Sequence, residues 1–263
     1  MTTSPPTTVT FALQPDIRRL VVLGDPHGDV AGLTAIVERE RGPTTQLLCV
    51  GDAVGYGDGP SSSQVCATLQ HLGVPTVEGN HEAWADPYGF LAIVADPERP
   101  RYLTEEALAW INGLPHRIEV TRHDGAPVAT LIHSIREPCW DWIGPENAPQ
   151  VAADLHHPRL ILSGHSHRPK LLHVAPGRWL AEHAPFDFLH EDALRRPLPT
   201  EGTLIVDAGS IGRPDPTELN LGPDYRGRRW GDWFGTYAVV ELERGVVTLR
   251  RWVKRAWPGL QGS

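Results

Sequence analysis

The sequence has few cysteines, no excess of positive charge and no long apolar run. Its three cysteines, Cys49, Cys66 and Cys139, form no CxxC pair, which argues against a disulfide framework and against a thiolate zinc site. The net charge of −8 leaves no chain-wide positive field for nucleic acid or an anionic membrane. No apolar run approaches the roughly 18 residues of a membrane span, and the N-terminus lacks the features of a secretory signal. We therefore expect a cytoplasmic protein that does not contact a membrane.

The composition is that of an ordinary folded protein, with 40% hydrophobic and 21% charged residues over 263 positions. This length suits one large α/β domain or two small ones. We expect a single domain over residues 1–263, with residues 1–16 as a loose arm rich in threonine and proline.

Short apolar runs followed by helical patterns organise the first half of the chain. Arg19–Leu23 precedes a helix at Ala31–Arg39, Gln46–Val50 precedes a helix near Ser62–Leu72, and Val74–Val77 precedes another helical stretch. Strands that alternate with helices predict a sheet whose functional residues collect at the carboxyl ends of the strands.

The second half contains strand-like runs that are joined mostly by loops, which predicts a second, mixed or antiparallel sheet. These runs are Ile118–Thr121, Val128–Ile132, Leu160–Leu162, Leu171–Val174, Leu204–Val206, Tyr237–Leu242 and Val246–Trp252. Two polar stretches rich in proline and glycine, 182–202 and 213–232, are expected to be long loops near the site.

Five polar segments that each follow an apolar run carry residues able to bind metal. They are Gly24-Asp25-Pro26-His27-Gly28-Asp29, Gly51-Asp52, Gly79-Asn80-His81-Glu82, His133-Ser134 and Gly164-His165-Ser166-His167. Because side chains at i and i+2 of a strand point to the same side, each DxH or HxH pair is expected to present two ligands in one direction. Apart from His81, the segments supply seven donors, too many for one tetrahedral ion but suited to two ions that share a carboxylate.

The series GDPHGD, GDAVGYG, GNHE, HS and GHSH resembles the metallophosphoesterases, also called calcineurin-like phosphoesterases, from Asp25 to His167. Residues 207–214 also resemble a segment that small prokaryotic members carry after the GHxH element. The resemblance implies an α/β fold, a four-layer α-β-β-α sandwich of two mixed sheets with a dinuclear metal site at the strand ends.

The resemblance also implies a role for each motif residue. Asp25, His27 and His167 would hold the first metal, Asp52 would bridge, Asn80, His133 and His165 would hold the second metal, and His81 would be the catalytic residue. His81 would act on the substrate as a general acid or a charge stabiliser. The cofactor would be two divalent ions, for which we favour manganese, with iron, zinc, nickel and cobalt as alternatives because the same ligands serve them.

Three positions differ from the protein-phosphatase branch of this family. Gly55 and Tyr56 stand where that branch has an Asp-Arg pair, and Glu78 replaces an arginine ahead of Gly79. The GDxVxYG form is instead similar to the small phosphodiesterase-like branch. Arg136, Arg168 and Arg213 lie beside the site segments and are candidates for phosphate contacts, although an ordinary ion pair or exposure to solvent is an equal alternative for each.

We therefore expect a metal-dependent phosphoesterase that hydrolyses a small anionic phosphodiester or nucleotide by attack of a metal-bridging hydroxide. The alternatives are a phosphomonoesterase, including a protein or sugar phosphatase, and a non-catalytic metal-binding regulatory module. A nuclease is a further alternative, because the chain from Arg226 onward is basic and rich in tryptophan. The overall acidity disfavours a nucleic-acid substrate.

Overall fold

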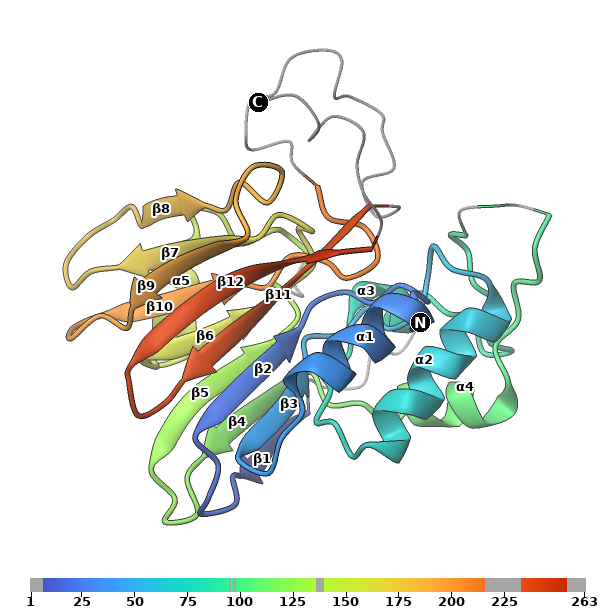
Figure 1. Ribbon diagram of the computed structural model, residues 1–263, viewed down its shortest axis with the longest axis horizontal. Coiled ribbons are helices and arrows are strands. Elements are labelled where there is room, and N and C mark those ends of the chain that lie inside the picture. The colour runs from blue at the N-terminus through green and yellow to red at the C-terminus, as the bar shows by residue number, and fades with distance from the viewer. Residues whose placement is uncertain (1–6, 95, 97, 136–139, 216–232, 255–263) are drawn as a thin grey trace.

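The computed structural model describes residues 7–94, 96, 98–135, 140–215 and 233–254. The candidate Arg136, Cys139 and most of the stretch 213–232 lie outside the described residues. Within the described part, two β-sheets pack against each other and carry helices on their outer sides (Figure 1).

The larger sheet has seven strands in the described part of the chain. Their order is β1 (Thr8–Ala12), β4 (Arg117–Thr121), β5 (Pro127–Ile132), β6 (Leu160–Ser163), β10 (Thr203–Asp207), β7 (Lys170–Val174) and β8 (Glu182–Pro185). The neighbours β5, β6 and β10 are parallel, so their carboxyl ends meet at one edge of the sheet. The β7 and β8 strands run antiparallel to their neighbours, which makes the sheet mixed.

The smaller sheet has five strands among the described residues. Their order is β3 (Thr45–Cys49), β2 (Arg19–Leu23), β11 (Phe234–Glu241), β12 (Val246–Val253) and β9 (Ala193–Pro197). The pair β3 and β2, at one edge of this sheet, is parallel, and the other pairings are antiparallel. The two segments that follow β2 and β3 therefore leave the sheet at the same edge.

Helices cover the outer faces of both sheets. They are α1 (Val30–Glu40), α2 (Gly59–His71), α3 (Asn80–Ala83), α4 (Glu105–Ile111) and α5 (Ala148–Asp154). The longer helices α1 and α2 begin at Asp29 and Asp58, whose side chains accept hydrogen bonds from the amides of Gly32 and Ser61. Figure 1 shows α1, α2 and α4 on the side of the smaller sheet and α5 behind the larger one.

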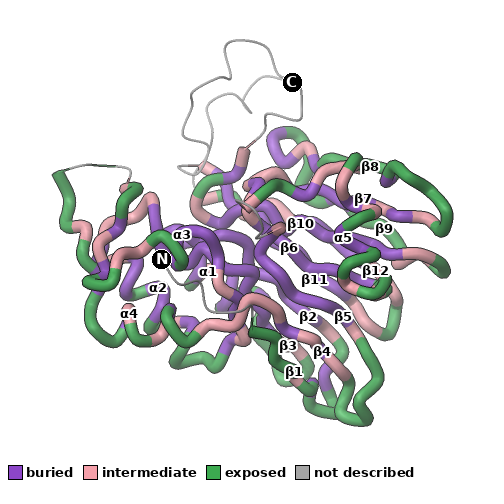
Figure 2. The backbone as a smooth tube through the Cα atoms, turned by 180° about the vertical axis from the view of Figure 1, so that it is seen from behind, coloured by how far each residue is buried: buried purple, intermediate pink, exposed green. Residues whose placement is uncertain are grey.

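The alternation of apolar residues along the strands separates the core into layers. In β2, Leu20 and Val22 join the cluster between the sheets, whereas Val21 and Leu23 pack toward α1, α2 and α4. In β6 of the larger sheet, Ile161 faces away from the space between the sheets and joins the cluster that α5 covers. Figure 2 shows the buried backbone along the central strands and the exposed backbone at the loops. The four-layer α-β-β-α sandwich is therefore confirmed.

Two segments that were expected to be irregular contain strands. Residues 8–12, expected within a loose arm, form β1 because Thr8-Val9-Thr10-Phe11 is rich in strand-forming side chains. The stretch 182–202, expected as a long loop, contains β8 and β9, which are edge strands of the two sheets. Proline signals a loop, but edge strands also tolerate it because one side of such a strand has no ladder partner.

One expected strand is reduced to a single bridge. Within Val74–Val77 only Thr76 is paired, through an isolated parallel bridge with Cys49. Pro75 has no N–H to donate, so the ladder cannot continue through it. The bridge still brings the chain alongside the end of β3 just before Asn80.

Candidate metal centre

The seven side chains that the sequence singled out as donors lie together where strands of both sheets end. Their potential ligand atoms form two donor groups, within each of which all atoms lie within 4.8 Å of one another. The first donor group is Asp25, His27, Asp52 and His167, and the second is Asp52, His133 and His165. Oδ1 of Asn80 lies 2.9 Å from Nε2 of His133 and 2.7 Å from Nδ1 of His165, which adds an amide oxygen to the second group.

The shared residue, Asp52, lies between imidazoles from both sheets. Its Oδ2 is 3.6 Å from Nε2 of His27, which follows β2, and 3.4 Å from Nε2 of His133, which follows β5. Nε2 of His27 also lies 2.8 Å from Nε2 of His167. Two imidazole nitrogens at this distance cannot both carry a proton, so either one donates to the other or both lone pairs face a cation.

Backbone carbonyls select which nitrogen of three imidazoles carries the proton. Nδ1 of His27 lies 2.9 Å from the carbonyl of Val54, and Nδ1 of His133 lies 2.6 Å from the carbonyl of Val50. Nε2 of His165 is 2.7 Å from the carbonyl of residue 140. A carbonyl only accepts hydrogen bonds, so the proton lies on these nitrogens and the other nitrogen of each neutral ring offers its lone pair to the donor group.

One carboxylate oxygen of the centre has no hydrogen bond. Oδ1 of Asp25 is fully buried and has no partner among the described residues, whereas its Oδ2 accepts a hydrogen bond from the amide of His165. A buried carboxylate oxygen without a partner is costly, and a cation would remove that cost. Carboxylate, amide and imidazole donors together suit divalent manganese, iron, zinc or cobalt, so the residues fit a divalent metal site.

The donors do not lie within strands, contrary to the i, i+2 argument. The β2 strand ends at Leu23 and β6 ends at Ser163, and His165 and His167 belong to different donor groups. Five donors instead have left-handed backbone angles, with φ of 37° at Asp25, 50° at His27, 52° at Asp52, 72° at His165 and 58° at His167. Such conformations cost about 1–3 kcal/mol each for side chains of this kind and persist only where the surrounding structure holds them.

Burial keeps three of the imidazoles neutral near pH 7. It lowers the pKa of His27 well below its usual range, lowers the pKa of His167 to about 3 and, together with the charge on His133, lowers the pKa of His165 to about 4. Neutral imidazoles have the free lone pairs that metal ligands need.

His133 is the exception, because two carboxylates face it. Burial would lower the pKa of His133, but the carboxylates of Asp52 and Asp25 raise it to about 10. Burial would likewise raise the pKa of Asp52, but the His133 charge holds it well below the usual range. Without a cation, His133 and Asp52 therefore form an ion pair, in which the proton on His133 stands in for the missing positive charge.

Glu82 holds two of the turns that carry donors. Its buried carboxylate accepts hydrogen bonds from the amides of Asp52 and Gly79 at 2.8 Å and from the amide of Val54 at 3.0 Å. These bonds join the turn after β3 to the start of α3, where Asn80 lies. The sequence analysis included Glu82 in a motif but gave it no role.

A second buried network lies under the turn after β6. The Ser166 hydroxyl, between two donor histidines, donates to Oδ2 of Asp207 at 2.6 Å and lies 3.0 Å from Nζ of Lys170. Nζ of Lys170 is 3.7 Å from the same Asp207 oxygen, and both side chains are almost completely buried. The register pairs Lys170 with Asp207 across β7 and β10. Sequence reasoning missed this pair because its members are 37 positions apart and belong to no metal motif.

His81 lies beside the first donor group and is held by ring contacts. Its ring centroid is 4.8 Å from those of His27 and Tyr56, and its amide donates to Oδ1 of Asp52 at 2.9 Å. A Cβ atom at Gly55 would lie 2.0 Å from Nδ1 of His81, so this ring fits only because residue 55 is glycine. Burial lowers the pKa of His81 below its usual value. Gly55 and Tyr56, which replace the Asp-Arg pair of the protein-phosphatase branch, thus form the surface against which the His81 ring packs.

The candidate arginines have different surroundings. The Arg213 guanidinium lies 3.9 Å above the ring of Tyr56, and its charge helps to lower the pKa of His81. Nε of Arg168 pairs with Oδ2 of Asp215 at 3.0 Å, and its guanidinium lies 4.3 Å above the ring of Trp142. The structure therefore places Arg213 next to the centre and gives Arg168 an ion pair.

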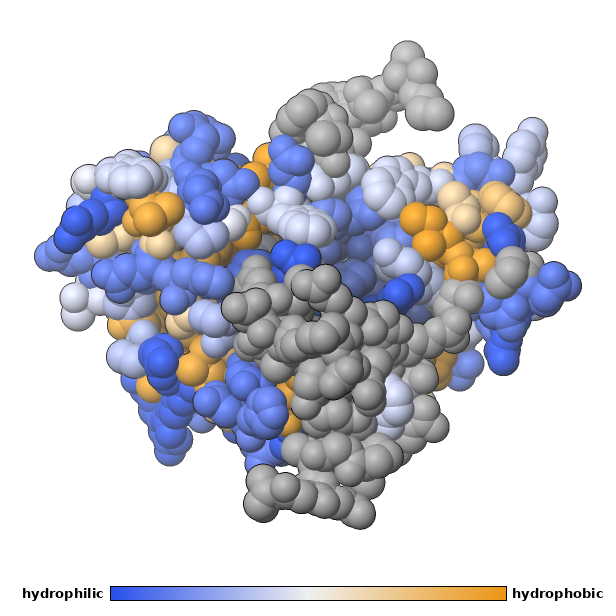
Figure 3. All heavy atoms as spheres, turned by 90° about the horizontal axis from the view of Figure 1, so that it is seen from above, coloured by the Kyte–Doolittle hydropathy of each residue, from blue (hydrophilic) through white to orange (hydrophobic). Residues whose placement is uncertain are grey.

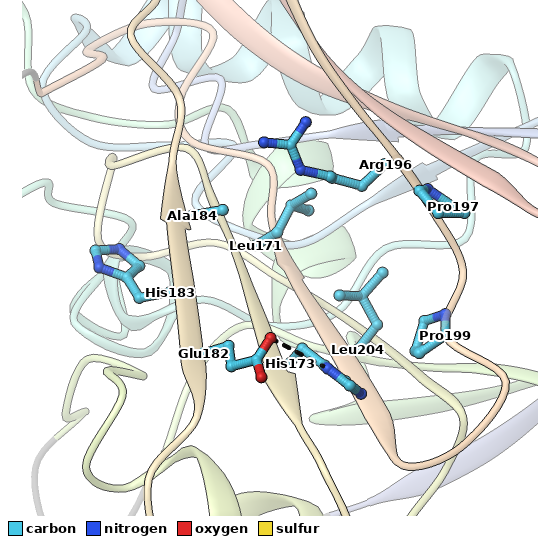
Figure 4. Close-up of a pocket in the computed structure, with 9 residues that line it drawn as sticks. All are labelled: Leu171, His173, Glu182, His183, Ala184, Arg196, Pro197, Pro199 and Leu204. Atoms are coloured by element: carbon cyan, nitrogen blue, oxygen red, sulfur yellow. Dashed lines mark ion pairs between the residues drawn. The ribbon is translucent and has the colours of Figure 1, made fainter.

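A hollow that is separate from the donor groups lies between the edges of the two sheets (Figure 4). Its volume is about 330 Å³, and residues of β7, β8, β10 and the end of β9 line it, including the ion pair of His173 with Glu182 at 3.8 Å. None of the residues that line this hollow belongs to either donor group.

The chain belongs to the calcineurin-like phosphoesterase family, whose sequence model matches residues 18–169. This finding confirms the resemblance carried by the motifs, and membership implies hydrolysis of phosphate esters. Among the described residues, no helix is both long and apolar enough to cross a membrane.

Similar proteins support the same fold. A crystal structure of a metallophosphoesterase from Sphaerobacter thermophilus has a TM-score of 0.64 and 23% identity, covering 91% of this chain and 89% of that one. A protein serine/threonine phosphatase from Saccharomyces cerevisiae has a TM-score of 0.50 and 14% identity, covering 96% of this chain and 85% of that one. An uncharacterized protein of Methanocaldococcus jannaschii is 24% identical over 206 residues, 74% of this chain and 76% of that protein.

Asp52→Asn should remove metal from both donor groups, because both include this carboxylate. The metal content after loading with Mn²⁺ and desalting would be measured by elemental analysis. Asp58→Asn is the matched control, because Asp58 caps α2 and belongs to neither donor group. Full metal occupancy in the Asp52→Asn variant would contradict the role of Asp52 as a ligand shared by both donor groups.

Metal loading should also release protons. In the metal-free protein His133 is protonated near neutral pH, because its pKa is about 10. Binding a cation requires its lone pair, so loading should release a proton from this residue, and the apparent affinity should rise with pH up to that pKa. Burial raises the pKa of Asp25 well above its usual range, so its carboxyl adds to the release. Calorimetric titration of Mn²⁺ in two buffers with different ionisation enthalpies measures the release. Heats that do not depend on the buffer would refute the prediction.

Lys170→Met should destabilise the protein by about 3–5 kcal/mol, because it removes a buried cation that lies 3.7 Å from the buried Asp207 carboxylate. Urea unfolding in the presence of a chelator measures the loss without any contribution from metal. The double variant Lys170→Met/Asp207→Asn should recover part of the stability. A loss below about 1 kcal/mol in the single variant, typical of an exposed pair, would show that the pair is not buried in solution.

Proposed function

We propose that this protein hydrolyses a small phosphodiester or nucleotide at a centre of two divalent ions. The observation that carries the proposal is the pair of donor groups that share Asp52 beside His81. In this proposal the first ion is held by Asp25, His27 and His167, the second by Asn80, His133 and His165, and Asp52 bridges them.

The ions would supply Lewis-acid chemistry, lowering the pKa of water and neutralising negative charge on the phosphoryl oxygens. Manganese is our choice of metal because the donor set mixes oxygen and imidazole ligands. The buried thiols of Cys49 and Cys66 are free, which supports the cytoplasmic location that we propose.

The chain's own residues prepare the site for an anion. Arg213 stands beside Tyr56 and His81, where its charge attracts the phosphate group of a substrate. A diester carries one negative charge, whereas a monoester carries close to two near neutral pH. The site has Tyr56 where the protein-phosphatase branch has an arginine, and Arg168 is paired with Asp215, so a substrate of lower charge fits it better.

His81 is placed to act on the leaving group. Its lowered pKa makes the ring neutral near pH 7, so at that pH it donates a hydrogen bond through N–H, and at lower pH it can transfer a proton. Its contacts with Gly55 and Tyr56 keep the ring in one orientation beside the first donor group.

The test compares methyl p-nitrophenyl phosphate, a diester, with p-nitrophenyl phosphate, a monoester, on protein reconstituted with Mn²⁺. Wild type should prefer the diester, and both His81→Ala and Asn80→Ala should lose about 10²–10⁴-fold in kcat. His123→Ala, on an exposed turn, is the matched control and should match wild type. Preference for the monoester would overturn the substrate assignment, and inactivity on both with metal bound would favour a binding role.

The contribution of His81 should depend on the leaving group and on pH. Because protonated His81 exists only below a pKa that lies under 6.5, the rate ratio of dimethyl phosphate to methyl p-nitrophenyl phosphate should rise as the pH falls through that pKa. The ratio, which cancels effects common to both substrates, should be flat with pH in His81→Ala. The same pH dependence in the variant would exclude His81 as the acid.

A further inference from the structure

A tryptophan with a half-exposed side chain stands next to His81. Trp84 is the C-cap residue of α3, the helix that begins at Asn80, so it lies three residues after His81 on the same side of the helical turn. The two ring centroids are 5.4 Å apart with an angle of 50° between the planes. Trp84 is 48% exposed, so burial in a core does not account for an indole at this position.

A small hollow of about 10 Å³, enough for about one water molecule, lies beside this indole, so a ligand ring can lie over its mouth but cannot enter it. The hollow is lined by Gly55, His81, Trp84, Leu91, Ala92 and Ile93. The wall formed by residues 91–93 is anchored, because the amide of Tyr56 donates to the carbonyl of Ile93 at 2.8 Å and the amide of Leu91 donates to the carbonyl of Arg101 at 2.9 Å. Apolar surface is visible on this side of the molecule, where α2, α4 and the segment between α3 and α4 lie (Figure 3).

The hollow and the phosphate site share one wall. His81 lines the hollow and also contacts His27 of the first donor group, whereas Arg213 stacks on Tyr56 at the other side of His81. A ligand whose phosphate lies at the donor groups would therefore place an attached group against Trp84. An open indole face favours a flat, polarisable ring over a flexible chain, because stacking needs two planes.

We propose that the exposed indole of Trp84, at the mouth of this hollow, forms a subsite by stacking on the base of a nucleotide substrate next to His81. The inference rests on the proposed function and narrows its substrate class to nucleoside phosphate esters. Trp84 is a specificity-determining residue in this proposal, and Ile93, which is 37% exposed, offers apolar surface beside the base.

The kinetic test uses two diesters that differ only in the base, the methyl ester of AMP and the methyl ester of ribose 5-phosphate. Wild type with Mn²⁺ should have a kcat/KM about 10-fold or more higher for the ester with adenine. Trp84→Ala should bring this ratio close to 1 by lowering only the adenine ester, and Trp84→Phe should retain part of it. Trp179→Ala removes an indole that is 81% exposed on the turn after β7 and should leave the ratio unchanged.

A binding experiment separates failure of the subsite from failure of the proposed function. Calorimetric titration with AMP and with ribose 5-phosphate should show tighter binding of AMP to wild type and equal binding of both to Trp84→Ala. If both esters are hydrolysed at the same rate, the subsite is refuted and the hydrolase proposal stands. If neither ester is hydrolysed, the hydrolase proposal fails and the AMP titration alone decides the subsite. A further ester, n-octyl methyl phosphate, tests the assignment to a base. If Trp84→Ala lowers its kcat/KM as much as it lowers that of the adenine ester, the assignment is overturned.

Discussion

The centre depends on two buried carboxyl groups, Asp25 and Asp52, which need a positive partner to be ionised. Burial raises the pKa of Asp25 well above its usual range, whereas the charge on His133 holds the pKa of Asp52 well below it. Neither carboxylate has a lysine or arginine among the contacts described, and imidazoles face both. Part of this charge is compensated by the proton on His133, which explains its pKa of about 10. Divalent cations would compensate it more completely, and the fixed tautomers of His27, His133 and His165 turn lone pairs toward the place where cations would lie.

The residues of this centre lie on turns with a strained backbone, which the rest of the structure holds in place. Left-handed turns at five donors have to be stabilised by their surroundings. Glu82 ties the turn that carries Asp52 to the helix that carries Asn80, and the Ser166 network ties the HSH turn to β10 through Asp207. Both supports are hydrogen bonds to buried groups, which are strong and costly to break in a medium of low dielectric constant. The four layers supply that medium.

The side of the centre that carries His81 departs from the protein-phosphatase branch. Glycine at position 55 leaves room for His81, and the ring of Tyr56 packs between His27, His81 and Arg213. The same turn anchors residues 91–93 and thereby forms the hollow next to Trp84. The Gly55-Tyr56 pair is therefore in contact both with Arg213 and with the apolar hollow next to Trp84.

The sequence by itself determined the two strand-helix units within residues 19–72, the residue types of the donors and the family. This was possible because each donor lies within a few residues of an apolar run, so the information is local. The division of the donors into two groups was implied by the family resemblance, but its physical cause lies in the tertiary structure, since His165 and His167 are separated by a left-handed turn and not by strand geometry. Only the tertiary structure decided the partners that come from distant segments: Lys170 for Asp207, and Gly55 and Trp84 for His81. Contacts of this kind depend on packing between segments far apart in the chain, which no local pattern of residues encodes.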